Sequence, residues 1–401
     1  MKYDFDNLPP REGTDSTKYD NRERIFGRAD VIPMWVADMD FAVASTIVAA
    51  LQRRAANPIY GYSITPPSYH DAIRDWLRGR HGWSVEREWL DFVPGVVPGL
   101  AFAIRAVSAP GERIVINPPV YHPFARMVKA NGRTLVESPL VDTGGLHYTF
   151  DWDDLDAKLD GARAILLCNP QNPTGRVFTR EELLRLGELC VKHSVVIISD
   201  EIHSDIIMPP HRHIPIASLG GGPGNSLGEQ IARRTISFFA PSKTFNLAGL
   251  ATSLAVTSDP TLRRMLRAEL DASHVEPNLF GTVALETAYA TGAEWLDQAI
   301  NYISGNMNYV VDFLERRLPQ IRARKSEGTY MMWLDCRALG LSQSELVDFM
   351  VHRAGLGLND GAMFGPGGEG FMRINLATSR AVVAKAMEQL AAAVAQLSAN
   401  P

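Results

Sequence analysis

The chain has 401 residues, more than one hydrophobic core usually serves, so we expect one large and one smaller domain. Its composition is that of a globular protein, with 46% hydrophobic residues, and its net charge of -5 gives no reason to expect binding to nucleic acid or to an anionic membrane. No apolar run reaches the roughly 18 residues of a membrane-spanning helix, and the polar start Met1–Pro10 lacks the apolar core of a signal peptide.

The three cysteines, Cys168, Cys190 and Cys336, cannot all form disulfides with one another, and their spacing does not indicate a zinc site. We expect three reduced and mostly buried thiols, as in a protein of the reducing cytoplasm. The predicted location is therefore the cytoplasm.

Residues 1–45 are predicted to form an N-terminal arm together with part of the smaller domain. They are rich in Asp, Pro and Gly and have few periodic stretches, which indicates extended structure. Within this arm, the segment Ile32–Phe41 is expected to dock on another part of the molecule.

Residues 46–285 alternate between helical and strand patterns and are predicted to form the large domain. Short apolar runs without polar alternation are typical of strands buried on both faces of a parallel sheet. Such runs occur in Glu112–Ile116, Ala164–Cys168, Val195–Ser199, Thr235–Phe239 and Thr252–Val256. Between two of these runs, Thr179 and Glu182 predict a capping box at the start of a helix over Thr179–His193. The repeated strand–helix–strand order predicts an α/β fold with a mostly parallel, doubly wound sheet.

Residues 286–401 are predicted to form a smaller α+β domain. A long helical stretch over Thr282–Leu318 leads into it, and the run Thr329–Leu334 alternates as a strand does. Two further helices are expected over Ser342–Ala354 and Ala381–Leu397. The Gly-rich stretch Gly220–Gly224 lies earlier in the chain and reads as a surface connector.

Two reactive side chains follow buried strands, and open parallel sheets bind their ligands at the carboxyl ends of the strands. Lys243 comes after a strand and a Pro-Ser turn, where desolvation lowers the pKa of an amine and makes it a nucleophile and a base. The alternative is a surface lysine in a turn. Asp200 closes an apolar strand, where a carboxylate is costly unless it meets a cation such as a protonated pyridine nitrogen. The alternative is a carboxylate that caps the next helix.

Three further segments indicate binding. A rigid strand-end loop fixes the amide of Asn172, although Asn, Pro and Gly also make plain turns. The turn Gly95–Val97 exposes backbone amides before a helix in which Pro98 suits the first position, so it suits a phosphate; many α/β loops look alike. Arg373 lies on an apolar strand, where it can grip a carboxylate with two hydrogen bonds or form a structural ion pair.

The order and spacing of these segments resemble the class I/II aminotransferase family of fold-type I pyridoxal-phosphate enzymes, over about residues 30 to 395. The family pattern is Asn-Pro-Thr-Gly from Asn172, then Asp200, then Ser242-Lys243, then Arg373. Within that family the chain resembles the branch of C–S β-lyases similar to cystathionine β-lyase. The segments that carry the narrower match are Pro33–Phe41, Tyr60–Tyr62, Pro94–Val97, Pro119–Tyr121, Asp200–His203 and Pro241–Asn246.

The resemblance implies pyridoxal 5'-phosphate as the cofactor and gives each site residue a role. Lys243 would form a Schiff base with the cofactor and later move the α-proton of the substrate, while Asp200 would keep the ring nitrogen protonated. Arg373 would bind the α-carboxylate of an amino-acid substrate. The remaining cofactor-binding residues would be Asn172 and His203 near the phenolate oxygen, Tyr121 on the ring face, and Gly95, Val96, Val97 and Ser242 around the phosphate. Tyr62 would reach the cofactor of a second subunit, which implies a homodimer with shared active sites.

Three positions depart from the pattern of the aspartate aminotransferases in that family. His203 stands in the place of a tyrosine, Ala251 in the place of an arginine that pairs with the phosphate, and Ala240 in the place of a hydroxyl residue. Without the arginine, phosphate binding must depend more on backbone amides and on Tyr62 of a partner subunit.

These departures favour a C–S β-lyase that eliminates a thiol from an L-amino acid to give pyruvate and ammonia. An aminotransferase is the alternative, and a regulatory protein on the same fold is a third hypothesis. Trp35 and Phe41 would line the substrate entrance, or simply pack the arm against the protein. His211 and His213 are read as surface residues of a Pro-rich loop, so no metal is expected.

Overall fold

The computed structural model describes residues 3–220 and 226–399 of the chain. Its larger sheet has seven strands in the spatial order β2 (Leu90–Val93), β10 (Ser253–Val256), β9 (Thr235–Phe239), β8 (Val196–Asp200), β7 (Ala162–Cys168), β3 (Arg113–Ile116) and β4 (Thr134–Glu137). Strand β10 runs antiparallel to β9 and β2, and the other neighbours are parallel. The prediction of a mostly parallel sheet is confirmed. Strands β2 and β4 were not predicted, because both lie at sheet edges and their polar, half-exposed residues interrupt the apolar pattern.

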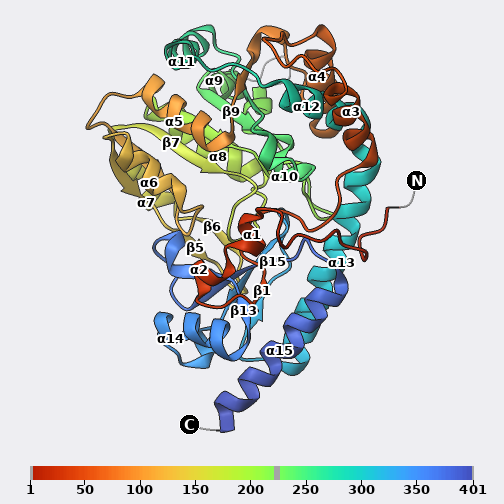
Figure 1. The fold of residues 1–401 in the computed structure, drawn as a ribbon. Helices are drawn as coiled ribbons and strands as arrows, with labels where there is room; N and C mark the ends of the chain where they lie inside the picture. Colours follow the sequence, from red (N-terminus) through yellow and green to blue (C-terminus); the bar gives the residue numbers. More distant parts are fainter. Residues whose placement is uncertain (1–2, 221–225, 400–401) are drawn as a thin grey trace.

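Helices cover both faces of this sheet, as the upper part of Figure 1 shows. On one face Ile114 and Ile116 of β3 pack with α5 (Val96–Val107), α6 (Pro123–Ala130) and α11 (Pro260–Ala272). On the other, Val115 and its neighbours pack with α7 (Trp152–Leu159), α8 (Arg180–Lys192) and α9 (Ser226–Ala232). The capping box of Thr179 and Glu182 forms at the start of α8, as predicted. Alternate side chains of each strand are therefore buried on opposite faces, which explains the continuous apolar runs.

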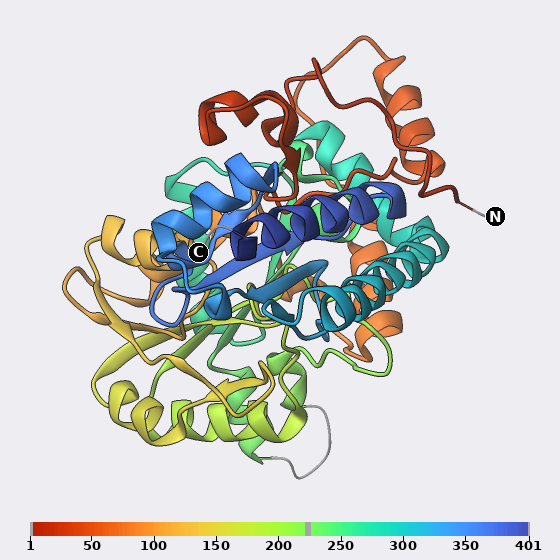
Figure 2. The ribbon, with the colours of Figure 1, turned by 90° about the horizontal axis from the view of Figure 1, so that it is seen from below.

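The smaller sheet is antiparallel, in the order β11 (Arg322–Ala323), β12 (Met331–Asp335), β15 (Phe371–Asn375) and β14 (Asn359–Asp360). It lies in the lower part of Figure 1, together with α14 (Gln343–Asp348) and α15 (Arg380–Ala399). Viewed from below in Figure 2, α15 crosses this part of the molecule, and it packs against α13 (Ala293–Arg317). A π-helical turn over Phe349–Arg353 continues α14, so the helix expected at 342–354 has two parts.

The prediction of one long helix over Thr282–Leu318 is wrong in one respect, since the structure has two helices there. Helix α12 (Leu279–Thr291) ends at Gly292, and α13 begins at the next residue. A Cβ atom at Gly292 would lie 2.3 Å from a ring carbon of Phe245, so only glycine fits this approach. The predicted boundary between residues 285 and 286 falls inside α12, and the division into 1–45, 46–285 and 286–401 stays a prediction.

The N-terminal arm runs between the two sheets. It contains α1 (Thr17–Asp20), α2 (Arg22–Phe26) and β1 (Ile32–Pro33), and β1 pairs in parallel with β13 (Leu356–Gly357). The segment expected to dock thus does so. The remaining α-helices and strands of the described residues are α3 (Ser45–Ala55), α4 (Pro67–His81), the hairpin of β5 (Leu140–Asp142) and β6 (Tyr148–Phe150), and the short α10 (Pro241–Thr244).

All three cysteines are buried and free of disulfides, as expected. Within residues 3–220 and 226–399, every helix is too short or too polar to traverse a lipid bilayer. The connector expected at Gly220–Gly224 lies outside the described residues except for Gly220.

Candidate active site

A cavity of about 220 Å³ opens at the carboxyl ends of the strands of the larger sheet. Cys168 ends β7 and Asp200 ends β8, while Lys243 follows β9, and all three line this cavity. The described residues that line it are Ala37, Pro94–Pro98, Tyr121, Cys168, Asn172, Asp200, Ile202, His203, Ser242, Lys243, Ala248 and Ala251–Ser253. Because parallel strands end at one edge of their sheet, residues far apart in the sequence converge here.

Lys243 lies in α10, a single turn that begins at Pro241, one residue beyond the end of β9. Its Nζ donates a hydrogen bond of 2.6 Å to the carbonyl oxygen of Ala37 in the N-terminal arm. Burial lowers the pKa of the Lys243 amine to about 8; nearby Asp38 and Asp200 oppose this shift, and Arg373 supports it. An amine with such a pKa is partly unprotonated at neutral pH and can act as a nucleophile or a base.

Asp200 is a buried carboxyl group without an ion-pair partner among the described residues. It accepts one hydrogen bond of 3.1 Å from the backbone amide of Ile202. Burial raises the pKa of Asp200 to about 7, against the effects of that hydrogen bond and of Lys243. A carboxylate in this position gains most from a bound cation, so the site suits a ligand with a protonated nitrogen.

The amino end of α5 faces the same cavity. Gly95 is its N-cap and has no side-chain capping bond, so the amides of the first turn are free of a protein cap. This is the arrangement in which a helix terminus binds an anion. Lys243 is the only Lys or Arg among the described residues that line the cavity, and Ala251 occupies the place where the family resemblance suggested an arginine. Pro98 is the third residue of α5 and not the first, since the helix begins at Val96; its missing N–H still falls in the first turn.

Asn172 and Arg373 are joined behind the cavity wall. Arg373 donates from Nη1 to Asn172 Oδ1 at 2.9 Å and from Nη2 to the Trp35 carbonyl at 2.8 Å and to Asn359 Oδ1. Its Nε is buried and has no hydrogen-bond partner among the described residues. Burial lowers the pKa of Arg373 to about 10, which leaves the side chain charged at neutral pH. The Nε–H therefore stays available for a further acceptor.

His203 and Tyr121 complete the cavity walls. The His203 ring is buried edge-on to Tyr330, at 5.8 Å between centroids, and its Nδ1 has no partner among the described residues. Burial holds the pKa of His203 well below its ordinary value, so the ring is neutral. Burial also raises the pKa of Tyr121.

Three of the expected site residues lie away from this cavity. The side chain of Tyr62 is fully exposed. Phe41 is buried against Phe5 and Tyr302, so its contacts agree with the second of the two expected roles, packing of the arm. The ring of Trp35 packs edge-on against Phe26, and its backbone carbonyl, not its ring, contacts Arg373.

The turn that carries Lys243 rests on residues that the sequence did not single out. Buried Asp205 accepts hydrogen bonds from Thr244 Oγ1 at 2.8 Å, from His81 Nε2 at 2.9 Å and from Trp76 Nε1 at 3.0 Å. We call these four residues the Asp205 cluster. The sequence did carry one signal for such a cluster. Asp200, Glu201 and Asp205 lie within six positions of a buried stretch, and each buried carboxyl group needs hydrogen-bond partners.

His213 is also part of the interior. Its Nε2 lies 2.8 Å from Glu201 Oε2, and both side chains are buried, so the reading of His213 as a surface residue is wrong. Glu201 in turn accepts a hydrogen bond from Ser237. Among residues 3–220 and 226–399, no three side chains of His, Cys, Asp or Glu are arranged to hold a metal ion.

Comparisons with known proteins agree with this geometry. The model of the family "Aminotransferase class I and II" matches residues 29–390. Cystathionine beta-lyase PatB of Bacillus subtilis (strain 168) is 42% identical over 393 residues, which cover 97% of this chain and 99% of that protein.

Two solved structures are similar over nearly their whole length. Cystalysin from Treponema denticola, which contains a pyridoxal 5'-phosphate cofactor, has a TM-score of 0.94 at 34% identity and covers 99% of this chain and 100% of its own. The PLP-bound C–S lyase from Staphylococcus hominis has a TM-score of 0.89 at 30% identity, with 98% of each chain covered. The family match spans both sheets and every residue of the cavity. The chain therefore belongs to the class I and II aminotransferase family.

Proposed function

We propose that this protein is a pyridoxal-phosphate-dependent C–S β-lyase that eliminates a thiol from an L-amino acid and yields pyruvate and ammonia. The observation that carries the proposal is the cavity in which the Lys243 amine, the buried Asp200 carboxyl and the amino end of α5 meet. The relatives named as cystathionine β-lyase and C–S lyase support the elimination of a sulfur leaving group.

The residues of the cavity fit pyridoxal phosphate. Asp200 lacks a cation partner among the described residues, and a protonated ring nitrogen supplies one. The free first-turn amides of α5 and the hydroxyl of Ser242 suit the phosphate, and the Lys243 amine suits the aldehyde carbon. Asn172 and His203 are proposed to lie near the phenolate oxygen and Tyr121 against the ring face. When bound, the cofactor draws electrons from the bonds at the substrate α-carbon.

The side chains of this chain then bind the substrate and move its proton. We propose that the unpaired Nε of Arg373 receives the α-carboxylate, which fixes the α-hydrogen toward Lys243. The Lys243 amine removes the α-proton; the electron pair of that C–H bond forms the Cα–Cβ double bond, and the Cβ–S pair leaves with the thiolate. The released 2-aminoacrylate takes up water and becomes pyruvate and ammonia.

An aminotransferase is the second candidate, since the family model carries that name. Both reactions need the same proton removal by Lys243. They differ in whether the proton returns to the cofactor carbon before the β-bond breaks. A regulatory protein on this fold is less well supported, because Lys243, Asp200 and Asn172 line one cavity and Arg373 donates a hydrogen bond to Asn172.

The test is sustained release of pyruvate from L-cystathionine by the purified protein with pyridoxal phosphate and without any keto acid. A lyase turns over many times per site under these conditions. An aminotransferase stops after one turnover and resumes only when a keto acid is added. The Lys243→Ala variant is expected to lose turnover by at least about a thousandfold, because it removes the base and the cofactor anchor.

We further propose that the enzyme is a homodimer and that Tyr62 contributes to the site of the partner subunit. Four large apolar side chains, those of Ile59, Tyr60, Tyr62 and Ile64, are exposed within six residues. Such a patch on a folded chain is typical of a protein interface. Mixed dimers test this. Lys243→Ala and Tyr62→Ala subunits, dissociated and reassociated together, should recover activity above that of either parent, because one site of each mixed dimer keeps both residues. Activity no higher than the parents would contradict a shared site.

The proposed location is the cytoplasm, where the three buried free thiols stay reduced. A fractionation of the source cells that finds the protein outside the cytoplasm would contradict this.

A further inference from the structure

The loop Trp35–Asp40 of the N-terminal arm lies where the two sheets meet at the active site. From the side of the larger sheet, Lys243 donates to the Ala37 carbonyl at 2.6 Å, and Asn246 makes two hydrogen bonds of 2.9 Å with the backbone of Met39. The loop backbone is thus fixed to the turn that carries Lys243.

From the side of the smaller sheet, three further residues hold the same loop. The Tyr330 hydroxyl donates to the Ala37 carbonyl at 2.8 Å, the same oxygen that Lys243 contacts. Asn375 Nδ2 donates to the carbonyls of Val36 and Asp38 at 2.7 and 2.6 Å. Arg373 donates to the Trp35 carbonyl. Every carbonyl from residue 35 to residue 39 therefore has a side-chain donor, so a shift of the loop would disturb both Lys243 and Arg373.

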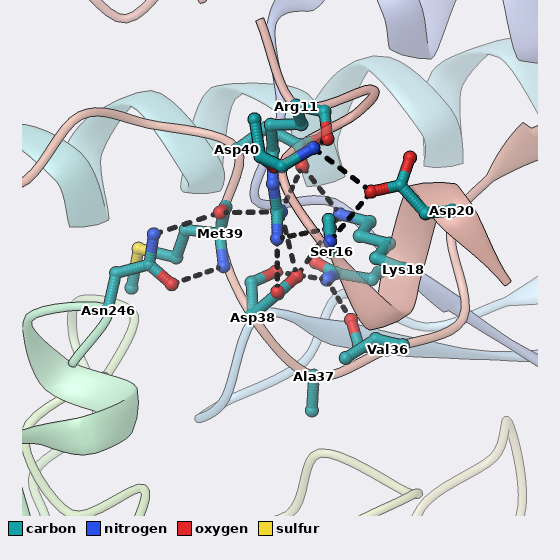
Figure 3. Close-up of polar contacts among 12 residues, drawn as sticks. Arg11, Ser16, Lys18, Asp20, Val36, Ala37, Asp38, Met39, Asp40 and Asn246 are labelled. Carbon is teal, nitrogen blue, oxygen red and sulfur yellow. Dashed lines mark hydrogen bonds and ion pairs between the residues drawn. The ribbon is translucent and has the colours of Figure 1, made fainter. Parts of the chain in front are cut away.

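Two carboxylates of this loop are held by two cations from the beginning of the arm, as Figure 3 shows. Arg11 makes a forked contact with Asp38, at 2.6 and 3.1 Å, and also reaches Asp40 at 2.8 Å. Lys18 lies 2.9 Å from Asp40 and 3.7 Å from Asp38. We call Arg11, Lys18, Asp38 and Asp40 the arm cluster. Its two positive and two negative charges balance.

The arm cluster is mostly closed to solvent. Lys18 is 1% exposed and Asp40 is 2% exposed, while Arg11 and Asp38 each keep about a fifth of their side chain accessible. A lysine with so little exposure is rare unless it is paired. Arg11 also donates to Met39 O at 3.1 Å, so it binds the loop backbone as well as its carboxylates.

We propose that Arg11 and Lys18 are positioning residues for Lys243: by holding Asp38 and Asp40, they fix the loop whose Ala37 carbonyl sets where the Lys243 amine lies. The inference rests on the proposed role of Lys243 but not on which bond the enzyme breaks. Arg11 and Lys18 act through the loop and do not themselves line the cavity.

The charged groups around Lys243 determine in which direction its pKa should move when the arm cluster is changed. They are Asp38 from the arm, Asp200 from the end of β8 and Arg373 from β15, with the neutral ring of His203 beside them. Asp38 favours the protonated amine, and Arg11 shares the charge of Asp38 through its forked contact. Removal of Arg11 leaves Asp38 free to act on Lys243, whereas removal of the Asp38 charge takes that effect away.

The experiment measures how fast Lys243 of the full-length apoprotein is acetylated by acetic anhydride as a function of pH, with the modified peptide quantified by mass spectrometry. We expect a midpoint of about 8 for the unaltered chain. Arg11→Gln should raise the midpoint by about 0.5 to 1 pH unit and Asp38→Asn should lower it by a similar amount. Arg11→Lys, which keeps the charge but not the fork, should lie between Arg11→Gln and the unaltered chain.

The matched control is Arg28→Gln. Arg28 belongs to the same arm, but its partner is Asp30, at 2.7 Å, and not a residue of the loop Trp35–Asp40. It should leave the midpoint unchanged. A merely structural role would lower the melting temperature of Arg11→Gln and Asp38→Asn while moving both midpoints in the same direction or not at all, and that result overturns the proposal. Because this titration uses neither cofactor nor substrate, opposed shifts in a protein that makes no pyruvate would contradict the proposed function and leave this inference intact.

Discussion

Two polar clusters contact the region of Lys243, and they are built on different principles. The Asp205 cluster surrounds one carboxylate with three side-chain donors, from Trp76, His81 and Thr244. The arm cluster sets two cations against two carboxylates. In the first cluster each donor has one acceptor, so loss of Asp205 leaves several groups unpaired. In the second, each carboxylate has two cations within reach, so loss of one partner leaves another.

The comparison also separates local from distant support. Thr244 is the neighbour of Lys243, so the Asp205 cluster holds the turn directly. The arm cluster acts across more than 200 residues of sequence, through a single carbonyl contact with Lys243. We therefore expect the Asp205 cluster to govern stability and the arm cluster to govern the position and the pKa of the amine.

The largest effect is expected for Asp205→Ala. The variant leaves the indole N–H of Trp76 and the hydroxyl of Thr244 without an acceptor in the interior, which should lower the free energy of unfolding by about 3 to 5 kcal/mol. Denaturant unfolding of the apoprotein measures this. The control Asp297→Ala removes a carboxylate that is 57% exposed and paired with Arg80, and should cost less than about 1 kcal/mol. Equal losses of unfolding free energy in the two variants would contradict the stabilising role of the Asp205 cluster.

A smaller loss is expected for Lys18→Met, which keeps an unbranched side chain one atom shorter and removes its charge. Asp40 retains its contact with Arg11, so the free energy of unfolding should fall by about 2 kcal/mol. Lys192→Met is the matched control, since Lys192 is 57% exposed and its pair with Asp156 should contribute less than about 1 kcal/mol. If Lys18→Met lowered the free energy of unfolding as much as Asp205→Ala does, the remaining contact of Asp40 with Arg11 would not compensate for the loss of Lys18.

The smallest expected effect is on the stability of the fold at low pH. Although burial opposes it, the pairing with Lys18 lowers the pKa of Asp40 below its ordinary value of 3.8. A carboxyl group whose pKa is lower in the folded state stabilises the fold above its unfolded pKa, and this contribution is lost as the pH falls through the folded pKa. Below about pH 4 the unaltered chain should therefore lose stability more steeply than Asp40→Asn, which is already less stable at pH 7. Thermal melts between pH 2 and 7 measure the two slopes. Parallel slopes would show that Asp40 is not held as an ion in the fold.

The sequence was informative where chemistry and burial coincide at the end of a strand. Asp200, Asn172 and Lys243 follow continuous apolar runs, and the geometry of parallel strands brings them together whatever the loops do. The core strands were predictable for the same reason. The edge strands β2 and β4 were not, because polar and incompletely buried residues break their apolar pattern.

The supporting clusters could not be predicted, since their partners lie far apart in the chain. Nothing near Lys18 in the sequence distinguishes it from a surface lysine, and only the fold shows that Asp40 meets it at 2.9 Å. The sequence left two roles open for Phe41, because an aromatic ring in a docking segment packs as readily as it binds a ligand, and the fold shows it packed against Phe5. The role of Tyr62 depends on a second subunit, which no pattern within one chain locates.

The most direct test of the account is to identify the lysine that binds the cofactor. The protein is incubated with pyridoxal phosphate, treated with borohydride to make the carbon–nitrogen bond permanent, digested and mapped by mass spectrometry. The account predicts one modified lysine, Lys243, with little modification in the presence of an excess of substrate. A cofactor bound to another lysine, or to none, would contradict the site described at the end of β9.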